Sequence, residues 1–94
     1  MLRPNQLKRA LKQGKPCLGI WLSFGHPTTN EAIAAAGYDF LMHDNEHSVT
    51  SLETTLSALR AAEAFPLTSV VRAPWNDAVY LKRLLDMGAQ SVMV

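Results

Sequence analysis

The stretch YDFLMHDNEHS, residues 38–48, decides the fold, because an apolar run passes directly into a group of polar side chains. Short apolar runs of this kind are typical of buried strands. The same order recurs on both sides, as CLGIWLSFGHP at residues 17–27 and as SVVRAPWN at residues 69–76. We therefore expect three strands, each of which ends in polar residues.

Helical segments are predicted before and between these runs. The first covers residues 6–13, with Asn5 as its N-terminal cap. Two more have capping-box spacing, in which a Thr and a Glu three residues later bond the first turn. The boxes are Thr28 with Glu31 and Thr50 with Glu53, and Asn76 is the expected cap of a fourth helix. The apolar positions that share a helix face form the predicted core: Leu52, Leu56, Leu59, Ala62, Leu81, Leu84 and Leu85.

Alternation of strands and helices predicts a parallel sheet, because parallel neighbours need a crossover that a helix usually supplies. SVMV, residues 91–94, begins a fourth strand. Since the chain stops inside this strand, we expect residues 1–94 to be one incomplete domain, the N-terminal part of a (β/α)8 TIM barrel of about 250 residues. The alternative is a small, complete parallel α/β module without enzymatic activity that binds a ligand or partner.

Composition excludes several classes of protein. Nine basic and eight acidic residues give a formal charge of +1, which is too balanced for a nucleic-acid binder. No apolar stretch approaches the roughly 20 residues that cross a bilayer, and the N-terminal residues have no signal-peptide core. Cys17 is the only cysteine, so no intramolecular disulfide is possible. We expect a cytoplasmic protein that binds neither nucleic acid nor membrane.

Residues 43–47, HDNEH, match the zinc-binding pattern H-x-x-E-H. That pattern needs a helix, because helical spacing brings both imidazoles to one ion. If the strand continued instead, His43 and His47 would lie about 13 Å apart at roughly 3.3 Å per residue. We therefore keep zinc binding as a minor alternative and expect His43 to be a packed or hydrogen-bonded histidine.

Polar clusters at the carboxyl ends of three adjacent strands predict a functional site, because sites in parallel α/β folds form where the strands end. The clusters are SFGHP, HDNEHS and RAPWN. Together they bring His, Asp, Glu and Arg to one edge. Trp21 and Phe24 are candidates for the pocket wall, although aromatic residues near a strand end also serve as core.

Four stretches together resemble the opening portion of the HpcH/HpaI family of metal-dependent pyruvate aldolases: GIWLSFGHP, AAAGYDFLMHDNEHS, VVRAPWND and LKRLLDMGAQSVMV. The combination of D-x-E-H, V-R-x-P and L-D-x-G-A is specific, whereas no single piece is. The resemblance covers nearly the whole chain from Gly19 onward. It implies a (β/α)8 barrel, a hexameric homo-oligomer, and reversible cleavage of a 4-hydroxy-2-oxo acid into pyruvate and an aldehyde.

The same resemblance implies roles for particular residues. His47 is the expected acid–base group, Arg72 the side chain that binds the substrate and stabilises the pyruvate enolate, and Asp86 the carboxylate that supports the histidine. Trp21 is expected to bind substrate. Asp44 and Glu46 are expected to support the site.

The resemblance also implies a divalent metal, Mg, Mn or Co, in the full-length protein. The family's Glu and Asp metal ligands lie on later strands, so we expect no metal ligand within this chain and an inactive 94-residue polypeptide. Asp86 falls near the end of a helix, toward the face of the barrel opposite the strand ends. Either a neighbouring subunit brings it to His47, or Asp44 is the partner of the histidine, or Asp86 is a surface or packing carboxylate.

Overall fold

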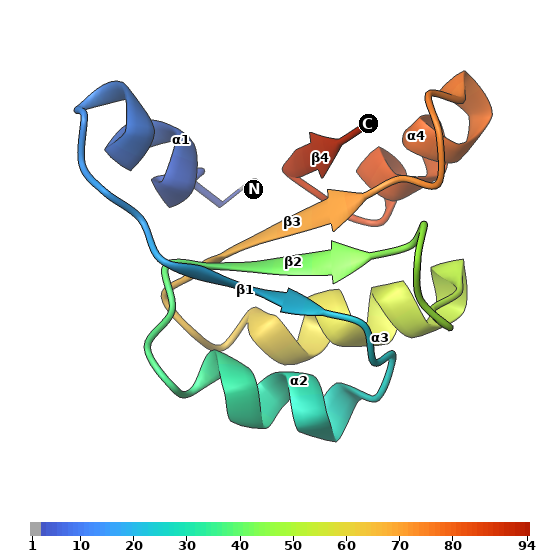
Figure 1. Ribbon diagram of the computed structural model, residues 1–94, viewed down its shortest axis with the longest axis horizontal. Helices are drawn as coiled ribbons and strands as arrows, with labels where there is room; N and C mark the ends of the chain where they lie inside the picture. The colour runs from blue at the N-terminus through green and yellow to red at the C-terminus, as the bar shows by residue number, and fades with distance from the viewer. Residues whose placement is uncertain (1–2) are drawn as a thin grey trace.

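The computed structural model describes residues 3–94 as four parallel strands in the order β1-β2-β3-β4, with four helices (Figure 1). The strands are β1 Gly19–Leu22, β2 Phe40–Asp44, β3 Thr68–Arg72 and β4 Ser91–Met93. The helices are α1 Gln6–Lys12, α2 Pro27–Ala34, α3 Leu52–Ala62 and α4 Ala78–Asp86. The predicted alternation and the parallel sheet are confirmed, with β1 limited to four residues of the quoted stretch 17–27.

The helices cover the two faces of the sheet unequally. Figure 1 shows α2 and α3 together against one face, whereas α1 lies toward the other face near the amino ends of the strands. Two hydrogen bonds anchor the start of the chain there, from the Leu7 N–H to Thr68 Oγ1 at 3.1 Å and from Asn5 Nδ2 to Ser91 Oγ at 2.9 Å. On the face opposite α2 and α3, Trp21 is 47% exposed near the carboxyl end of β1.

Sheet register assigns side chains to these faces. Leu22, His43 and Val71 are aligned on adjacent strands and are buried on the helix-covered side. The core there consists of two apolar clusters, one around Leu22 and Leu41 and one around Val71 and Leu84. Because successive strand residues alternate between faces, Trp21 and the aligned pair Asp44 and Arg72 share the other side.

The helix caps differ from the predicted ones at three helices. The cap of α2 is His26, whose Nδ1 accepts a hydrogen bond from the Thr28 N–H at 3.2 Å, so the predicted Thr28 box is wrong. Pro27 occupies the first helical position, where its missing N–H costs nothing. A box does cap α3, but it joins Ser51 to Thr54, one residue beyond the predicted pair. Asp77, not Asn76, caps α4.

The predicted core of α4 is correct in part. Leu84 is fully buried and Leu81 packs against the same cluster, whereas Leu85 is 57% exposed. Leu81 and Leu84 therefore face the sheet, whereas Leu85, about 100° further around the helix than Leu84, is turned toward solvent. Among residues 3–94, no helix combines the length and the apolar character needed to cross a membrane.

Candidate active site at the carboxyl ends of the strands

Asp44, the last residue of β2, organises the polar cluster at this edge of the sheet. Its buried carboxylate accepts backbone N–H bonds from Glu46 at 2.8 Å and from His47 at 3.0 Å, both on Oδ1. Its Oδ2 accepts the indole N–H of Trp21 on β1 at 2.9 Å. One carboxylate thus fixes both the neighbouring aromatic side chain and the path of the chain after β2.

Arg72 ends β3 beside Asp44 and completes the cluster. One guanidinium nitrogen lies 3.9 Å from Asp44 Oδ2, which is an ion-pair distance but too long for a hydrogen bond. The other terminal nitrogen forms an ion pair with Glu46. The guanidinium carbon also lies 5.6 Å from the centre of the Trp21 ring, within the range of a cation–π contact. A guanidinium has five N–H donors, so this arrangement leaves donors for a bound anion.

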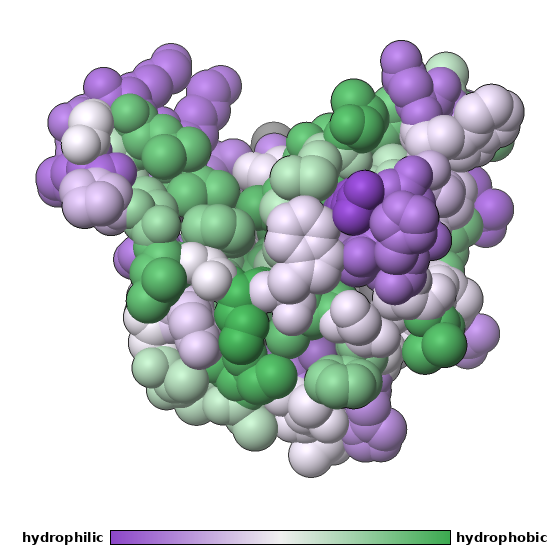
Figure 2. Space-filling view, viewed as in Figure 1, coloured by the Kyte–Doolittle hydropathy of each residue, from purple (hydrophilic) through white to green (hydrophobic). Residues whose placement is uncertain are grey.

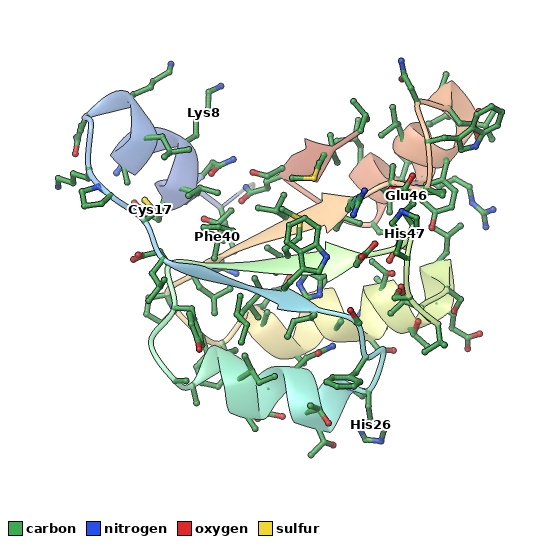
Figure 3. All side chains as sticks on the ribbon, in the orientation of Figure 1. Lys8, Cys17, His26, Phe40, Glu46 and His47 are labelled. Carbon is green, nitrogen blue, oxygen red and sulfur yellow. The ribbon has the colours of Figure 1, made fainter. Side chains whose placement is uncertain are left out.

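Glu46 joins Arg72 to His47. The His47 imidazole Nε2 lies 3.2 Å from Glu46 Oε1, the atom that also contacts Arg72. The His47 side chain is 71% exposed, whereas the Arg72 side chain is 28% exposed. Figure 3 shows Glu46 and His47 side by side near the end of β2, apart from His26 at the start of α2.

Electrostatics keep the Asp44 carboxylate ionised. Burial raises the pKa of Asp44. Hydrogen bonds from the His47 N–H, the Trp21 indole and the Glu46 N–H, together with the charge of Arg72, lower this pKa by more than burial raises it. The net result is a pKa below the ordinary value. Two carboxylates face one guanidinium here, so these three charged groups together carry surplus negative charge.

His43 does not belong to this cluster. It is buried on the helix-covered side of the sheet, where its Nε2 lies 3.1 Å from Ser69 Oγ. Burial lowers the pKa of His43 to about 4, so the ring is neutral at physiological pH. The expectation of a packed, hydrogen-bonded histidine is confirmed. The zinc alternative lacks its helix, because residues 43 and 44 are strand and the segment after them is a turn; no group of three or more candidate metal ligands occurs among residues 3–94.

Asp86 lies apart from the other predicted site residues. It is the last residue of α4 and lines an open depression of about 440 Å³ between α3 and α4, together with Leu52, Glu53, Leu56, Arg83 and Met87. The ion pairs of the described residues do not join it to His47, whose imidazole lies beside Glu46. The alternative that Asp44 is the partner of the imidazole does not match this arrangement, since Asp44 binds the backbone N–H of His47 instead. Phe24, the other candidate for the pocket wall, is 61% exposed beyond the end of β1.

Sequence reasoning missed the hydrogen bonds that support the loop after β2. The hydroxyls of Ser48 and Thr50 donate to the Asp44 carbonyl, and the side chain of Asn45 is bonded to Thr55 and Tyr80. Asn45 and Ser48 belong to the motif HDNEHS, so the sequence offered a signal for them. The periodicity of α4 gave no sign that Tyr80 does more than pack. Figure 2 shows hydrophilic surface gathered near this carboxyl edge, beside apolar surface over the middle of the sheet.

Comparisons with known proteins identify the family of this α/β chain. A family model described as HpcH/HpaI aldolase/citrate lyase matches residues 18–94. The chain belongs to this family. Among curated relatives, the 4-hydroxy-2-oxo-heptane-1,7-dioate aldolase of Salmonella arizonae is 43% identical over 90 residues, which are 96% of this chain and 34% of that protein.

Solved structures agree with this assignment. A HpcH/HpaI aldolase/citrate lyase family protein from Burkholderia cenocepacia J2315 superposes with a TM-score of 0.90 at 42% identity, over 96% of this chain and 36% of that one. The citrate synthase SbnG superposes with a TM-score of 0.83 at 38% identity, over 92% of this chain and 35% of that one. The chain thus spans about a third of its relatives and corresponds to the N-terminal part of a TIM barrel, which confirms the expected fold.

Proposed function

We propose that the natural polypeptide containing these residues is an aldolase, which cleaves a 4-hydroxy-2-oxo acid reversibly into pyruvate and an aldehyde. The observation that carries this proposal is the contact of Glu46 with both Arg72 and His47 at the carboxyl ends of β2 and β3. A group that exchanges protons and a permanent cation are thereby held together. The family and the name of the Salmonella relative support the same chemistry.

The proposed cleavage needs one base and one anion-stabilising group. The His47 imidazole takes the proton of the 4-hydroxyl, the C3–C4 bond breaks, and the aldehyde leaves. The bonding electrons become the C2–C3 double bond of the pyruvate enolate, whose negative charge lies on the 2-oxo oxygen. The imidazolium of His47 then returns the proton to C3, which gives pyruvate with no net change in protons.

Arg72 is the proposed partner of that developing charge. A guanidinium stays ionised at all physiological pH values and donates in a planar fork, so it can stabilise an enolate oxygen in a site that excludes water. Asp44 and Glu46 hold the guanidinium in place, and Trp21 offers an aromatic face beside it that we propose contacts the substrate. These two carboxylates are therefore proposed as supporting residues.

A divalent ion, Mg, Mn or Co, is part of the proposal. Among residues 3–94, no group of three or more His, Cys, Asp or Glu side chains could hold a metal by itself. We propose that the ligands belong to residues outside these 94, and that the 94-residue polypeptide alone is inactive. An ion at the 2-oxo oxygen would supply additional stabilisation of the enolate charge.

We propose that Asp86 acts at the site of a neighbouring subunit. Its place in the depression between α3 and α4 separates it from His47 within one chain. A homo-oligomer, a hexamer in our proposal, would bring this depression against the strand ends of another copy. Asp86 would then support the imidazole of that copy. Measuring the mass of the natural polypeptide in solution, with and without Asp86→Ala, tests whether this face is used.

A direct assay tests the proposed activity. The purified natural polypeptide is incubated with 4-hydroxy-2-oxo acids of increasing chain length, with and without EDTA, and pyruvate release is measured. We expect turnover that EDTA abolishes and that added Mg, Mn or Co restores. Because one solved relative is named a citrate synthase, citrate formation is measured in parallel. Citrate formation without any pyruvate release would replace the aldolase proposal with that second function.

A further inference from the structure

Asn45 is a buried polar residue that touches three elements of the fold. It follows Asp44 directly, and its backbone N–H donates to the Arg72 carbonyl at 2.9 Å, which extends the pairing of β2 with β3. Its side chain Oδ1 lies 2.9 Å from the hydroxyls of Thr50 and Thr55, and its Nδ2 donates to the Tyr80 hydroxyl at 2.9 Å. The carboxamide therefore links the loop after β2 to both α3 and α4.

The Asn45 carboxamide meets these partners with both an acceptor and a donor. Two hydroxyls face its oxygen and a third oxygen faces its nitrogen. Asn45 is 8% exposed and Thr55 is 1% exposed, so the carboxamide has little access to water. A buried donor that loses its partner bears the full cost of its desolvation. Removal of the Tyr80 hydroxyl would therefore disturb the position of Asn45 itself.

A shift of Asn45 would move the residues before and after it in the chain, which belong to the proposed active site. Asp44 precedes it and accepts the N–H groups of Glu46 and His47, which follow it. Tyr80 is bonded to Asn45, which lies between Asp44 and Glu46 in the chain. We infer that Tyr80, acting through Asn45, is a positioning residue that sets the geometry of Asp44, Glu46 and His47. The inference rests on the proposed function for its catalytic consequence.

The two tyrosines of the chain provide a matched test. Tyr80→Phe removes the hydroxyl that accepts from Asn45, whereas Tyr38→Phe removes a hydroxyl beside the apolar cluster under β1 and β2. In the natural polypeptide, amide hydrogen exchange is measured at Glu46 and His47. We expect Tyr80→Phe to speed exchange there by about tenfold, since the part-buried bond to Asn45 is lost, and to leave the core amides of β3 unchanged. Tyr38→Phe should leave exchange at Glu46 and His47 as in the wild type.

Steady-state kinetics supply the second readout. Tyr80→Phe should lower kcat by about tenfold while KM changes less than about twofold, because the geometry of the reacting groups is altered rather than substrate binding. Asn45→Ala should lower kcat similarly, and the double variant should be no worse than Asn45→Ala alone. Additive effects on kcat would overturn the inference, because the two side chains would then act independently.

Amide hydrogen exchange and enzymatic activity together distinguish failure of the proposed function from failure of the positioning inference. If the wild type cleaves no 4-hydroxy-2-oxo acid, the proposed function fails, and local exchange at Glu46 and His47 still decides whether Tyr80 positions the segment. If Tyr80→Phe matches Tyr38→Phe in exchange, the positioning inference fails whatever the activity. Faster exchange throughout β3 and α3 would also overturn it, since that result indicates global destabilisation.

Discussion

At the scale of single residues, Asp44 and Arg72 show how a strand register becomes a site. They are partners in the pairing of β2 with β3, and the alternation of strand residues turns both away from the helix-covered core. Their neighbours His43 and Val71 are also aligned but face the helices. From the sequence alone, the charged residues were predicted to lie at one edge of the sheet. The alternation of strand side chains between the two faces explains why His43 does not belong to this charged group.

A substitution at Arg72 tests the role of the guanidinium fork. Arg72→Lys keeps the positive charge but cannot hold Glu46 and an enolate oxygen with a planar pair of donors. We expect kcat for pyruvate release to fall by about 100-fold or more, comparable to loss of an oxyanion donor. Circular dichroism controls for folding. Near-normal turnover by a folded Arg72→Ala protein would remove Arg72 from the mechanism.

Burial of His43 predicts a dependence of stability on pH. Its pKa is about 4 in the folded protein, against 6.5 as the ordinary value, so between these values the unfolded chain takes up a proton that the folded chain does not. The free energy of unfolding therefore falls as pH decreases through this window, by up to about 3 kcal/mol in total. It is unaffected by His43 above this window.

Urea unfolding at pH 7.5 and pH 4.5 measures the effect. His43→Gln should make the difference in unfolding free energy between the two pH values smaller by about 2 kcal/mol or more. A variant whose unfolding depends on pH as steeply as the wild type would contradict the assignment. The proton uptake would then belong to other groups.

At the scale of elements, the apolar patterns predicted the strands and helices, whereas the caps were misplaced by one or two residues. Thr28 and Glu31 have the spacing of a capping box, but Pro27 starts α2 earlier and His26 supplies the acceptor. Spacing identifies residues that could cap, while the backbone conformation before the helix selects the one that does. Leu85 was misassigned because Leu81 has helix-surface neighbours at both Leu84 and Leu85, and spacing alone does not decide which of the two is buried.

Ser51 caps α3, whereas Thr28 was predicted to cap α2 and does not. Thr28 therefore serves as the control for a test of the α3 cap. Ser51 accepts a hydrogen bond from the Thr54 N–H at 3.2 Å, and the Thr54 hydroxyl accepts the Ser51 N–H at 2.8 Å. Ser51→Ala should lower the free energy of unfolding by about 1 kcal/mol. Thr28→Ala should change it by less than about 0.5 kcal/mol, since its side chain is exposed and does not cap α2. Equal effects in thermal unfolding would contradict the assigned caps.

At the scale of the whole molecule, the order of strands and helices predicted the parallel sheet, and the family resemblance favoured part of a barrel over a small complete module. Each crossover returns the chain to the same edge, so residues about 25 apart, such as Trp21, Asp44 and Arg72, meet without any local signal that joins them. Asn45 and Tyr80 could not have been paired from sequence, because their contact depends on how α4 packs against the loop after β2. The place of Asp86 in a separate depression likewise required the packed helices.

Pyruvate release by the natural polypeptide and its His47→Ala variant tests the central claim most directly. His47 is exposed beside Glu46 and belongs to no metal cluster of the described residues, so its loss should stop proton transfer without unfolding the protein or releasing a metal. We predict metal-dependent cleavage of a 4-hydroxy-2-oxo acid by the wild type. His47→Ala should lower kcat by about 100-fold or more, with binding of pyruvate and of Mn²⁺ retained. Wild-type turnover by a folded His47→Ala protein, or loss of Mn²⁺ binding on this substitution, would contradict the account.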